Sequence, residues 1–379
     1  MPNQHIEEIE QLLRPVELGA LPAQPLVSLL TPNYNYGCFV GEAIESALAQ
    51  TYANFEMIVC DDGSTDSSCK IVEGYAQRDP RIRLIRKGNG GVATALNAAY
   101  RQSKGEIVCL LDADDRYLPE KLEKAVQAFQ SRPDSGFLVH RMFHTDAAGR
   151  RVGVIPCLVD HASGWYGPFV VRNGDVPPGI VLGSALCLRR EIGDLIFPLP
   201  EGVRSCLDSV VMTLATLMTP LIWLAMSLAE YRYHGNNLTK TTQITSESWN
   251  RSMQNGRMLW ELRRDYLKGV HPRLAEMLPA FDQRSGSFLG AYIQARLQPG
   301  GKELRSYRSL VRSESFSRIP WAARLFWRLS ILLPPPLFRH AMNLVLRPSR
   351  LKQFIWKVRE ATSVRTGRVA DESSRFLAL

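Results

Sequence analysis

The chain has 379 residues, of which 45% are hydrophobic and 22% are charged, and its formal net charge is +9. This length exceeds that of one ordinary domain, and the composition excludes a disordered or fibrous protein. Seven cysteines lie scattered without a CxxC pair or a metal-ligand spacing, which indicates a reducing compartment. The polar, acidic N-terminus lacks the basic and apolar segments of a signal peptide, so we expect none.

Residues 1–24 predict a short amphipathic helix and a linker, and a regular alternation of strands and helices begins after them. Short apolar runs predict the strands, and segments with helical periodicity separate them. The predicted strands span residues 26–30, 55–60, 82–86 and 107–111, and the predicted helices span residues 40–50, 67–77 and 92–103. This alternation predicts a parallel, doubly wound sheet, which binds ligands at the carboxyl ends of its strands.

Three polar loops directly follow predicted strands: TPNYN at residues 31–35, DDGSTD at residues 61–66 and DADD at residues 112–115. Turn chemistry alone explains any one of these loops, because Asp, Asn and Gly dominate turns. Three such loops at the same end of one sheet favour a ligand site. Neither the dinucleotide pattern GxGxxG nor a P-loop occurs, so a nucleotide is not held in either of those ways.

The run IVCLLDADD at residues 107–115 ends in the carboxylates of Asp112, Asp114 and Asp115. Carboxylates crowded at the end of a buried strand repel one another unless a cation lies between them. A divalent metal with hard oxygen ligands fits this pattern. The alternative is a solvated turn in which Asp114 or Asp115 caps the following helix.

Residues 209–229 contain no charged side chain and are about long enough to cross a bilayer. Pro220 interrupts this run, and a proline breaks a continuous helix. We therefore predict a buried helix ending near Thr219, followed by a strand over residues 221–228.

Three blocks, VSLLTPNYN, FEMIVCDDGSTDSS and GGVATALNAAYRQSKGEIVCLLDADDRYLPEKLEKAV, resemble family 2 glycosyltransferases in their order and spacing. Weaker similarity continues through GSALCLRREI and RSCLDSVVMTLA to AEYRYHGNNLT. The resemblance implies the GT-A fold, a mixed, mostly parallel sheet flanked by helices, over residues 25–240. Residues 1–24 are then an N-terminal extension, and residues 241–379 are a basic, amphipathic helical region.

The resemblance also implies a site for a nucleotide-sugar donor. Asp62, with Asp61 beside it, would accept a hydrogen bond from the nucleotide base. The implied nucleotide-sugar-binding residues are Thr31, Pro32, Asn33, Tyr34, Asn35, Asp61, Asp62, Gly90, Gly91, Asn97, Asp112, Ala113, Asp114, Gly183 and Ser184. Many relatives carry an arginine before the asparagine, whereas this chain has Leu96, so we expect no phosphate-binding cation there.

For the cofactor, the resemblance implies Mg²⁺ or Mn²⁺ held by Asp112 and Asp114, with Asp115 an equal candidate for a direct ligand. His234, in YRYHGNN, would reach the metal or the diphosphate, or else serve as a hydrogen-bonded structural residue. Arg232 is predicted to be a surface charge rather than a phosphate contact.

Asp208, in RSCLDSVVM, matches the position of the family's catalytic aspartate. We predict that it is the general base that takes the proton of the acceptor hydroxyl, or else an ordinary N-cap. A base opposite the leaving group implies a single displacement with inversion at the anomeric carbon. Relatives often show Glu-Asp here, and Leu207 replaces that Glu. Side chains that either bind the acceptor sugar or pack the core are His140, His144, His161, Trp165 and Tyr166.

Beyond Gly300, basic residues outnumber acidic ones by about three to one. Apolar and basic side chains alternate there at helical spacing, at Trp321, Arg324, Leu325, Phe326, Arg328 and Leu329 and again near residues 354–356. Such a helix is typical of the interface of an anionic membrane. A lid on the catalytic domain or a homodimer surface is the open alternative. No nucleic-acid-binding motif occurs.

These observations predict an inverting, metal-dependent glycosyltransferase that transfers a sugar from a nucleotide-sugar to a glycan or lipid-linked acceptor in surface polysaccharide biosynthesis. The expected location is cytoplasmic, peripheral at the inner face of the plasma membrane. Two alternatives stay open: a nucleotidyltransferase on a related fold, and a non-enzymatic, membrane-associated module that binds sugar nucleotides.

Overall fold

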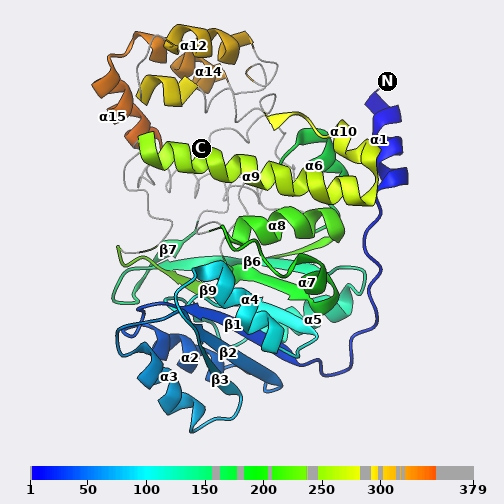
Figure 1. Ribbon diagram of the computed structural model, residues 1–379, viewed down its shortest axis with the longest axis vertical. Coiled ribbons are helices and arrows are strands. Elements are labelled where there is room, and N and C mark those ends of the chain that lie inside the picture. Colours follow the sequence, from blue (N-terminus) through cyan, green and yellow to red (C-terminus); the bar gives the residue numbers. More distant parts are fainter. Residues whose placement is uncertain are drawn as a thin grey trace, which may run out of the picture. The chain divides into compact units, whose positions relative to one another are not determined.

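The computed structural model describes residues 2–155, 163–176, 183–203, 207–235, 237, 246–281, 292–297, 302–312, 316 and 321–346 (Figure 1). The chain divides into two compact units. The first comprises Met1–Lys240 and Asp265–Ala275, and the second comprises Thr241–Arg264 and Glu276–Leu379. The predicted sequence boundaries at residues 24 and 240 stay predictions.

The described part of the first unit contains one nine-stranded, mixed sheet with the order β3-β2-β1-β4-β8-β6-β9-β5, and β7 pairs with β6. Four neighbouring strands are parallel: β1 (Val27–Asn33), β2 (Phe55–Asp61), β3 (Ile82–Arg86) and β4 (Ile107–Leu110). The remaining strands are β5 (Arg116–Tyr117), β6 (Phe137–Thr145), β7 (Arg151–Val154), β8 (Leu186–Arg189) and β9 (Leu221–Arg232). β8 runs antiparallel to both β4 and β6, whereas β9 runs parallel to β6.

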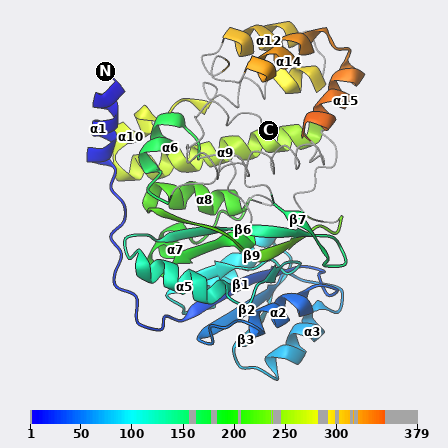
Figure 2. The same cartoon turned by 180° about the vertical axis from the view of Figure 1, so that it is seen from behind.

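Helices cover both faces of this sheet. α4 (Val92–Gln102) and α7 (Arg190–Ile196) lie on the face toward the viewer in Figure 1. The opposite face, seen in Figure 2, carries α2 (Val40–Leu48), α3 (Ser68–Ala76) and α5 (Lys121–Ser131). Because helices cover both faces, strands such as β4 are buried along their whole length, as their continuous apolar sequence predicts.

The other helices of the first unit are α1 (Pro2–Leu12), α6 (Gly167–Asn173), the short 3₁₀ helix η1 (Gly183–Ala185) and α8 (Leu207–Met218). The helices α9 (Ser246–Val270) and α10 (Pro272–Met277) include residues of both units. The second unit also contains α12 (Glu303–Arg312), α14 (Trp321–Leu329), η3 (Ser330–Leu332) and α15 (Pro335–Leu346). Its core is made by Tyr292, Ile293, Leu297, Leu310, Phe316, Trp327, Phe338 and Met342.

The prediction for the uncharged run over residues 209–229 is confirmed, because α8 ends at Met218 and β9 begins at Leu221. The predicted end of this strand, residue 228, was wrong. β9 continues to Arg232, since its last residues pair with β6, Arg232 lying opposite Thr145, and with β5, Glu230 lying opposite Arg116. Among the described residues, no helix combines the length and the apolar character that a bilayer span requires.

Candidate active site

Side-chain hydrogen bonds hold the first two polar loops together at the carboxyl ends of β1 and β2. Asn33, opposite Asp61 in the sheet register, donates from Nδ2 to Asp61 Oδ2 at 2.7 Å. The Ser64 hydroxyl oxygen accepts the backbone N–H of Asn35 at 2.8 Å, and its Oγ lies 3.2 Å from Asn33 Nδ2. TPNYN and DDGSTD are therefore one connected wall rather than two independent turns.

Asp62 anchors the glycine-rich loop that opens α4. Its Oδ1 accepts the backbone N–H of Gly90 at 3.0 Å, and its Oδ2 accepts that of Gly91 at 2.7 Å. The ammonium of Lys87 pairs with the same carboxylate and donates to Thr94 Oγ1 at 2.7 Å. Lys87 was missed by the sequence reasoning, because its role depends on a carboxylate 25 residues away.

The third loop gathers three carboxylates after β4. One oxygen each of Asp112, Asp114 and Asp115 lie within 4.8 Å of one another. Ser184, in η1, closes the turn: its hydroxyl oxygen accepts the backbone N–H of Asp112 at 3.0 Å and donates to Asp115 Oδ2 at 2.6 Å. The other oxygen of Asp115 accepts the backbone N–H of Arg232 at 3.0 Å.

Asp114 has its own partners from the segment that follows β9. His234 Nε2 lies 2.9 Å from Asp114 Oδ2, and Asn237 Nδ2 lies 3.3 Å from the same oxygen. The His234 ring packs against two aromatic rings, that of Phe39 at 4.7 Å and that of Tyr36 at 5.6 Å between centroids. His234 is thus fixed in orientation toward Asp114.

The acidic turn carries more negative charge than its surroundings compensate. Burial, and then the negative charges of Asp114 and Asp208, raise the pKa of Asp112 to about 7. Burial and the charges of Asp114 and Asp112 also raise the pKa of Asp115. A divalent cation favours the ionised forms, and oxygen ligands about 2 Å from Mg²⁺ fit carboxylates gathered this closely. The residues present therefore fit the metal that the sequence predicted.

A cavity of about 430 Å³ opens between the three loops, η1 and the start of α8. Of the residues predicted from the sequence, those that line it are Pro32, Asn33, Tyr34, Asp62, Gly90, Gly91, Asp112, Ala113, Asp114, Gly183 and Asp208. Those that do not line it are Thr31, Asn35, Asp61, Asn97, Asp115, Ser184 and His234. The structure thus brings the predicted base and two predicted metal ligands to the wall of one cavity.

Several predicted residues stand behind that wall. Asp61, Asp115, Ser184 and His234 hold wall residues or the acidic turn through the hydrogen bonds described above. Asn97, in α4, uses both ends of its amide on the backbone of Leu199, at 2.9 Å and 2.7 Å. Thr31 is fully buried, and its hydroxyl has no hydrogen-bond partner among the described residues.

Sequence reasoning missed four further wall residues with polar side chains: Tyr36, Asn89, Tyr231 and Asn237. Asn237 is the last residue of the HGNN block, three residues after His234, so this block was the sequence signal that could have indicated it. No motif of the sequence points to Tyr36 as a site residue, since only the fold brings it to the same cavity as Asp114. Burial, and then the charges of Asp114 and Asp112, raise its pKa, so it presents a neutral phenol to the cavity.

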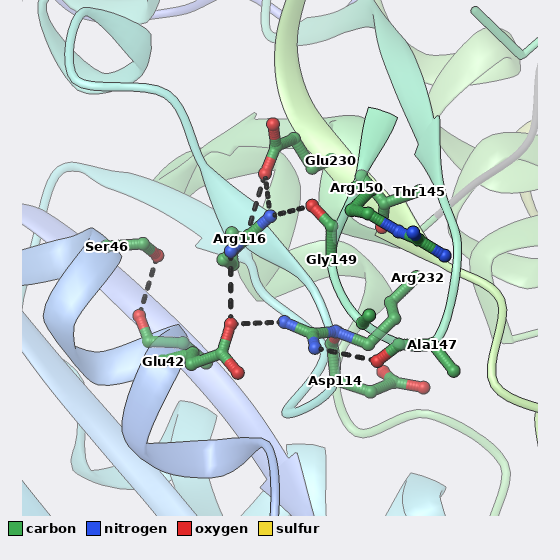
Figure 3. Close-up of polar contacts among 12 residues, drawn as sticks. Glu42, Ser46, Asp114, Arg116, Thr145, Ala147, Gly149, Arg150, Glu230 and Arg232 are labelled. Carbon is green, nitrogen blue, oxygen red and sulfur yellow. Dashed lines mark hydrogen bonds and ion pairs between the residues drawn. The ribbon is translucent and has the colours of Figure 1, made fainter. Parts of the chain in front are cut away.

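The prediction that Arg232 is a surface charge was wrong. Its side chain is only 4% exposed. Its guanidinium pairs with Glu42 of α2 and donates from Nε to the backbone oxygen of Asp114 at 3.1 Å. A charged residue at the end of a strand is usually solvated. Here the guanidinium contacts Glu42 of α2, the backbone of Ala147 and the backbone of Asp114 (Figure 3).

Asp208 lies in the first turn of α8, within the helix rather than at its cap. Its Oδ1 accepts the backbone N–H of the adjacent Ser209 at 2.8 Å. Burial raises its pKa above the ordinary value of an aspartate. The carboxylate therefore lies at the cavity with a basicity that is greater than that of a solvated aspartate.

The region between residues 135 and 204 contributes less to this cavity. His140 is buried in β6, and burial lowers its pKa to about 3, so it stays neutral. Trp165 donates from Nε1 to the backbone oxygen of Leu217 at 3.2 Å. His144 packs edge to face with Tyr233, and Tyr166 packs in the same way with Phe169. His161 lies outside the described residues.

A mixed sheet of this order, with a cavity at the carboxyl ends of its parallel strands and an acidic turn after β4, defines a glycosyltransferase of the GT-A fold. The sequence model of the family described as "Glycosyl transferase family 2" matches residues 28–173 of the chain. The chain is 30% identical over 247 residues to an uncharacterized glycosyltransferase of Nostoc sp., a match that covers 64% of this chain and 75% of that protein. It therefore belongs to glycosyl transferase family 2 and is a glycosyltransferase.

Other relatives are matched over shorter parts of their length. The chain is 35% identical over 127 residues to the hyaluronan synthase of Pasteurella multocida, which is 34% of this chain and 13% of that enzyme. Among solved structures, S. aureus TarS 1–349 in complex with UDP-GlcNAc superposes with a TM-score of 0.53. That match has 19% identity and covers 83% of this chain and 89% of that one, so it shows the shared fold.

We predict that Ser184→Ala lowers the free energy of unfolding by about 2 kcal/mol, because a buried carboxylate and a backbone N–H both lose a hydrogen-bond partner. Urea denaturation followed by circular dichroism measures this. Ser131→Ala is the control, since Ser131 is exposed and, among the described residues, bonds only within its own helix, to Ala128. Equal stability of the two variants would contradict the assigned role of Ser184.

Proposed function

We propose that this glycosyltransferase transfers a sugar, with inversion and with the help of a divalent metal, from a nucleotide-sugar to a hydroxyl of a glycan or lipid-linked acceptor in polysaccharide biosynthesis. The observation that carries the proposal is the common cavity of Asp208, Asp112 and Asp114. A single displacement needs a base on one side of the sugar and charge neutralisation at the leaving group on the other. No observation favours the alternatives of a nucleotidyltransferase or a non-enzymatic module.

Asp112 and Asp114 are the proposed direct ligands of Mg²⁺ or Mn²⁺, because their side chains line the cavity. Asp115, whose two oxygens already accept hydrogen bonds, and His234, which binds Asp114, orient these ligands from behind. When bound, the metal supplies neutralisation of the charge that develops on the leaving diphosphate. His234 Nε2 would bind the metal itself only if its hydrogen bond to Asp114 were broken.

Another part of the cavity wall is the proposed nucleotide site. Its wall is formed by the loop of Pro32, Asn33 and Tyr34, by Asp62 and by the two glycines that Asp62 holds. Asp61 supports this wall through its bond with Asn33, and Ser64 holds Asn35. Thr31 and Asn97 belong to β1 and α4, which carry other wall residues. Gly183, on η1, is the proposed floor under the donor sugar, where a Cβ would come within 3.2 Å of Asp112 Oδ2.

Asp208 is the proposed base. In its ionised form it accepts the proton of the acceptor hydroxyl as that oxygen attacks the anomeric carbon. Burial raises its pKa, which makes the ionised carboxylate a stronger proton acceptor than a solvated aspartate. Tyr36 and Tyr231, which also line the cavity, offer hydroxyl and ring surfaces to the substrates.

The second unit is the proposed contact with the membrane surface. Four leucines along α14, η3 and α15 are at least 49% exposed: Leu325, Leu329, Leu332 and Leu337. Arg328 and Arg339 are exposed in the same helices. Apolar side chains flanked by arginine suit an anionic lipid interface, and hence a peripheral position at the inner face of the plasma membrane. A homodimer surface or a lid is the competing interpretation of the same residues.

We predict that Asp208→Asn lowers the rate of sugar transfer by about 10² to 10⁴-fold while nucleotide binding is retained, because the amide keeps the shape but not the basicity. The measurement is release of nucleoside diphosphate from a panel that includes UDP-GlcNAc. Asp194→Asn is the control, since Asp194 binds Tyr100 and lies outside the cavity wall. Full activity of Asp208→Asn would overturn the assignment.

The wild-type rate should also fall as the pH is lowered, because a base acts only when ionised. Since burial raises the pKa of Asp208, the midpoint of this acid limb lies above the ordinary value of about 4. The limb is expected to disappear in the residual activity of Asp208→Asn. A limb that persists there would assign the ionisation to another group.

For the membrane contact, we predict that the full chain co-sediments with phosphatidylglycerol vesicles and not with phosphatidylcholine vesicles. The double variant Leu329→Glu/Leu332→Glu should lose this binding, because it places carboxylates on the apolar, lipid-facing surface. Leu195→Glu is the matched control, as Leu195 is 55% exposed in the first unit. Unchanged sedimentation of the double variant would remove this surface from consideration.

A further inference from the structure

Arg232 is a buried cation beside the acidic turn, at the end of β9. The side chain of Arg232 is 4% exposed, and a guanidinium is costly to bury unless its donors are all engaged. Its partners therefore show what the buried charge accomplishes, and they fall into two groups, one in the acidic turn and one in the surrounding scaffold.

The first group consists of the acidic residues themselves. The backbone N–H of Arg232 donates to Asp115 Oδ1 at 3.0 Å, and its Nε donates to the backbone oxygen of Asp114 at 3.1 Å. Its own carbonyl oxygen accepts Asn237 Nδ2 at 2.7 Å, and that same nitrogen lies 3.3 Å from Asp114 Oδ2. One residue thus fixes the main chain of Asp114, the side chain of Asp115 and, through Asn237, the side chain of Asp114.

The second group fixes the guanidinium from outside the turn (Figure 3). Its Nη2 pairs with Glu42 of α2, and its Nη1 donates to the backbone oxygen of Ala147 at 3.3 Å. Glu42 is shared with Arg116 of β5, whose Nη1 lies 3.1 Å away and whose Nε donates to Glu230 at 2.8 Å. The positions of the acidic residues are thereby coupled to α2, β5 and β9.

These contacts exclude a direct role for Arg232 in holding the diphosphate. The Nε and both terminal nitrogens of the guanidinium have protein partners, and Arg232 does not line the cavity. The planar guanidinium of Arg232 donates hydrogen bonds in three directions. A lysine cannot reproduce this geometry, because its ammonium is a single point charge.

We infer that Arg232 is a positioning residue, which holds Asp114 and Asp115 in the arrangement that binds the metal. This inference rests on the metal site of the proposed function. Residues that orient metal ligands typically change metal affinity by about 10 to 100-fold when they are replaced. Preorganisation by Arg232 means that the carboxylates do not have to be gathered against their mutual repulsion when the metal binds.

The test is Mn²⁺ binding by the full chain, followed by the electron paramagnetic resonance signal of free Mn²⁺. Arg232→Lys keeps the positive charge but removes the fork, and it is expected to weaken Mn²⁺ binding at least about 10-fold. Glu42→Gln, at a carboxylate that is 42% exposed, releases the guanidinium with less risk to folding and should weaken binding in the same direction. Circular dichroism establishes that each variant is folded.

Arg189→Lys is the matched control. Arg189 is 1% exposed and its guanidinium also binds backbone oxygens, that of Gly19 at 2.6 Å and that of Pro133 at 3.4 Å. It lies opposite Ile107, at the end of β4 remote from the acidic turn. This variant should melt at a lower temperature and bind Mn²⁺ as the wild type does.

The outcomes separate the inference from the function on which it rests. Wild-type Mn²⁺ affinity in folded Arg232→Lys or in Glu42→Gln overturns the role of Arg232 and leaves the metal site standing. An equal loss of Mn²⁺ affinity in Arg232→Lys and Arg189→Lys overturns the role of Arg232 as well, because it indicates a general loss of stability. A wild-type protein that binds no Mn²⁺ overturns both proposals.

Discussion

The mutual repulsion of Asp112, Asp114 and Asp115 is the constraint on which the rest of this structure depends. Three carboxylates end a strand that is buried on both faces, where charge is costly. Backbone and side-chain donors hold them there: the hydroxyl of Ser184, the backbone N–H of Arg232 and the side chains of His234 and Asn237. None of these donors is a neighbour in sequence, so the fold itself assembles the site.

The sheet divides this work between its two halves. The parallel strands β1, β2 and β4 deliver three polar loops to one edge, as the carboxyl ends of parallel strands do. The antiparallel insertion of β8 beside β4 brings Ser184 to the acidic turn, and the long β9 brings Arg232. The loops after β1 and β2 form the proposed nucleotide wall. Ser184 and Arg232 hold in place the acidic turn after β4, on which the proposed chemistry depends.

Local sequence patterns predicted what local physics determines. The strand over residues 82–86 was predicted with its observed limits. Pro220 helped to distinguish the helix and the strand within residues 209–229 from a membrane span. β1 extends three residues beyond its predicted end, because Asn33 pairs with Asp61 of β2. Pairing of this kind depends on a neighbour strand and leaves no mark in the periodicity of either segment.

The same distinction applies to the site. The resemblance pointed to Asp62, Asp112 and Asp208, and these residues line one cavity. The partners of Asn97 and Arg232 lie about a hundred residues away in the sequence, at Leu199 and Asp114, so no local pattern indicates them. Arg232 was predicted to be at the surface because arginine usually is, and only the covering segments show otherwise.

The most direct test of the central claim, a metal-dependent nucleotide site at this cavity, is thermal melting with UDP, GDP or dTDP in the presence of MnCl₂ or EDTA. A ligand that binds only the folded protein raises its melting temperature by mass action. We predict that at least one nucleotide raises it with Mn²⁺, that EDTA abolishes the shift, and that Asp114→Ala does not show it. A shift that persists in EDTA and in Asp114→Ala, or no shift with any nucleotide, would contradict the account.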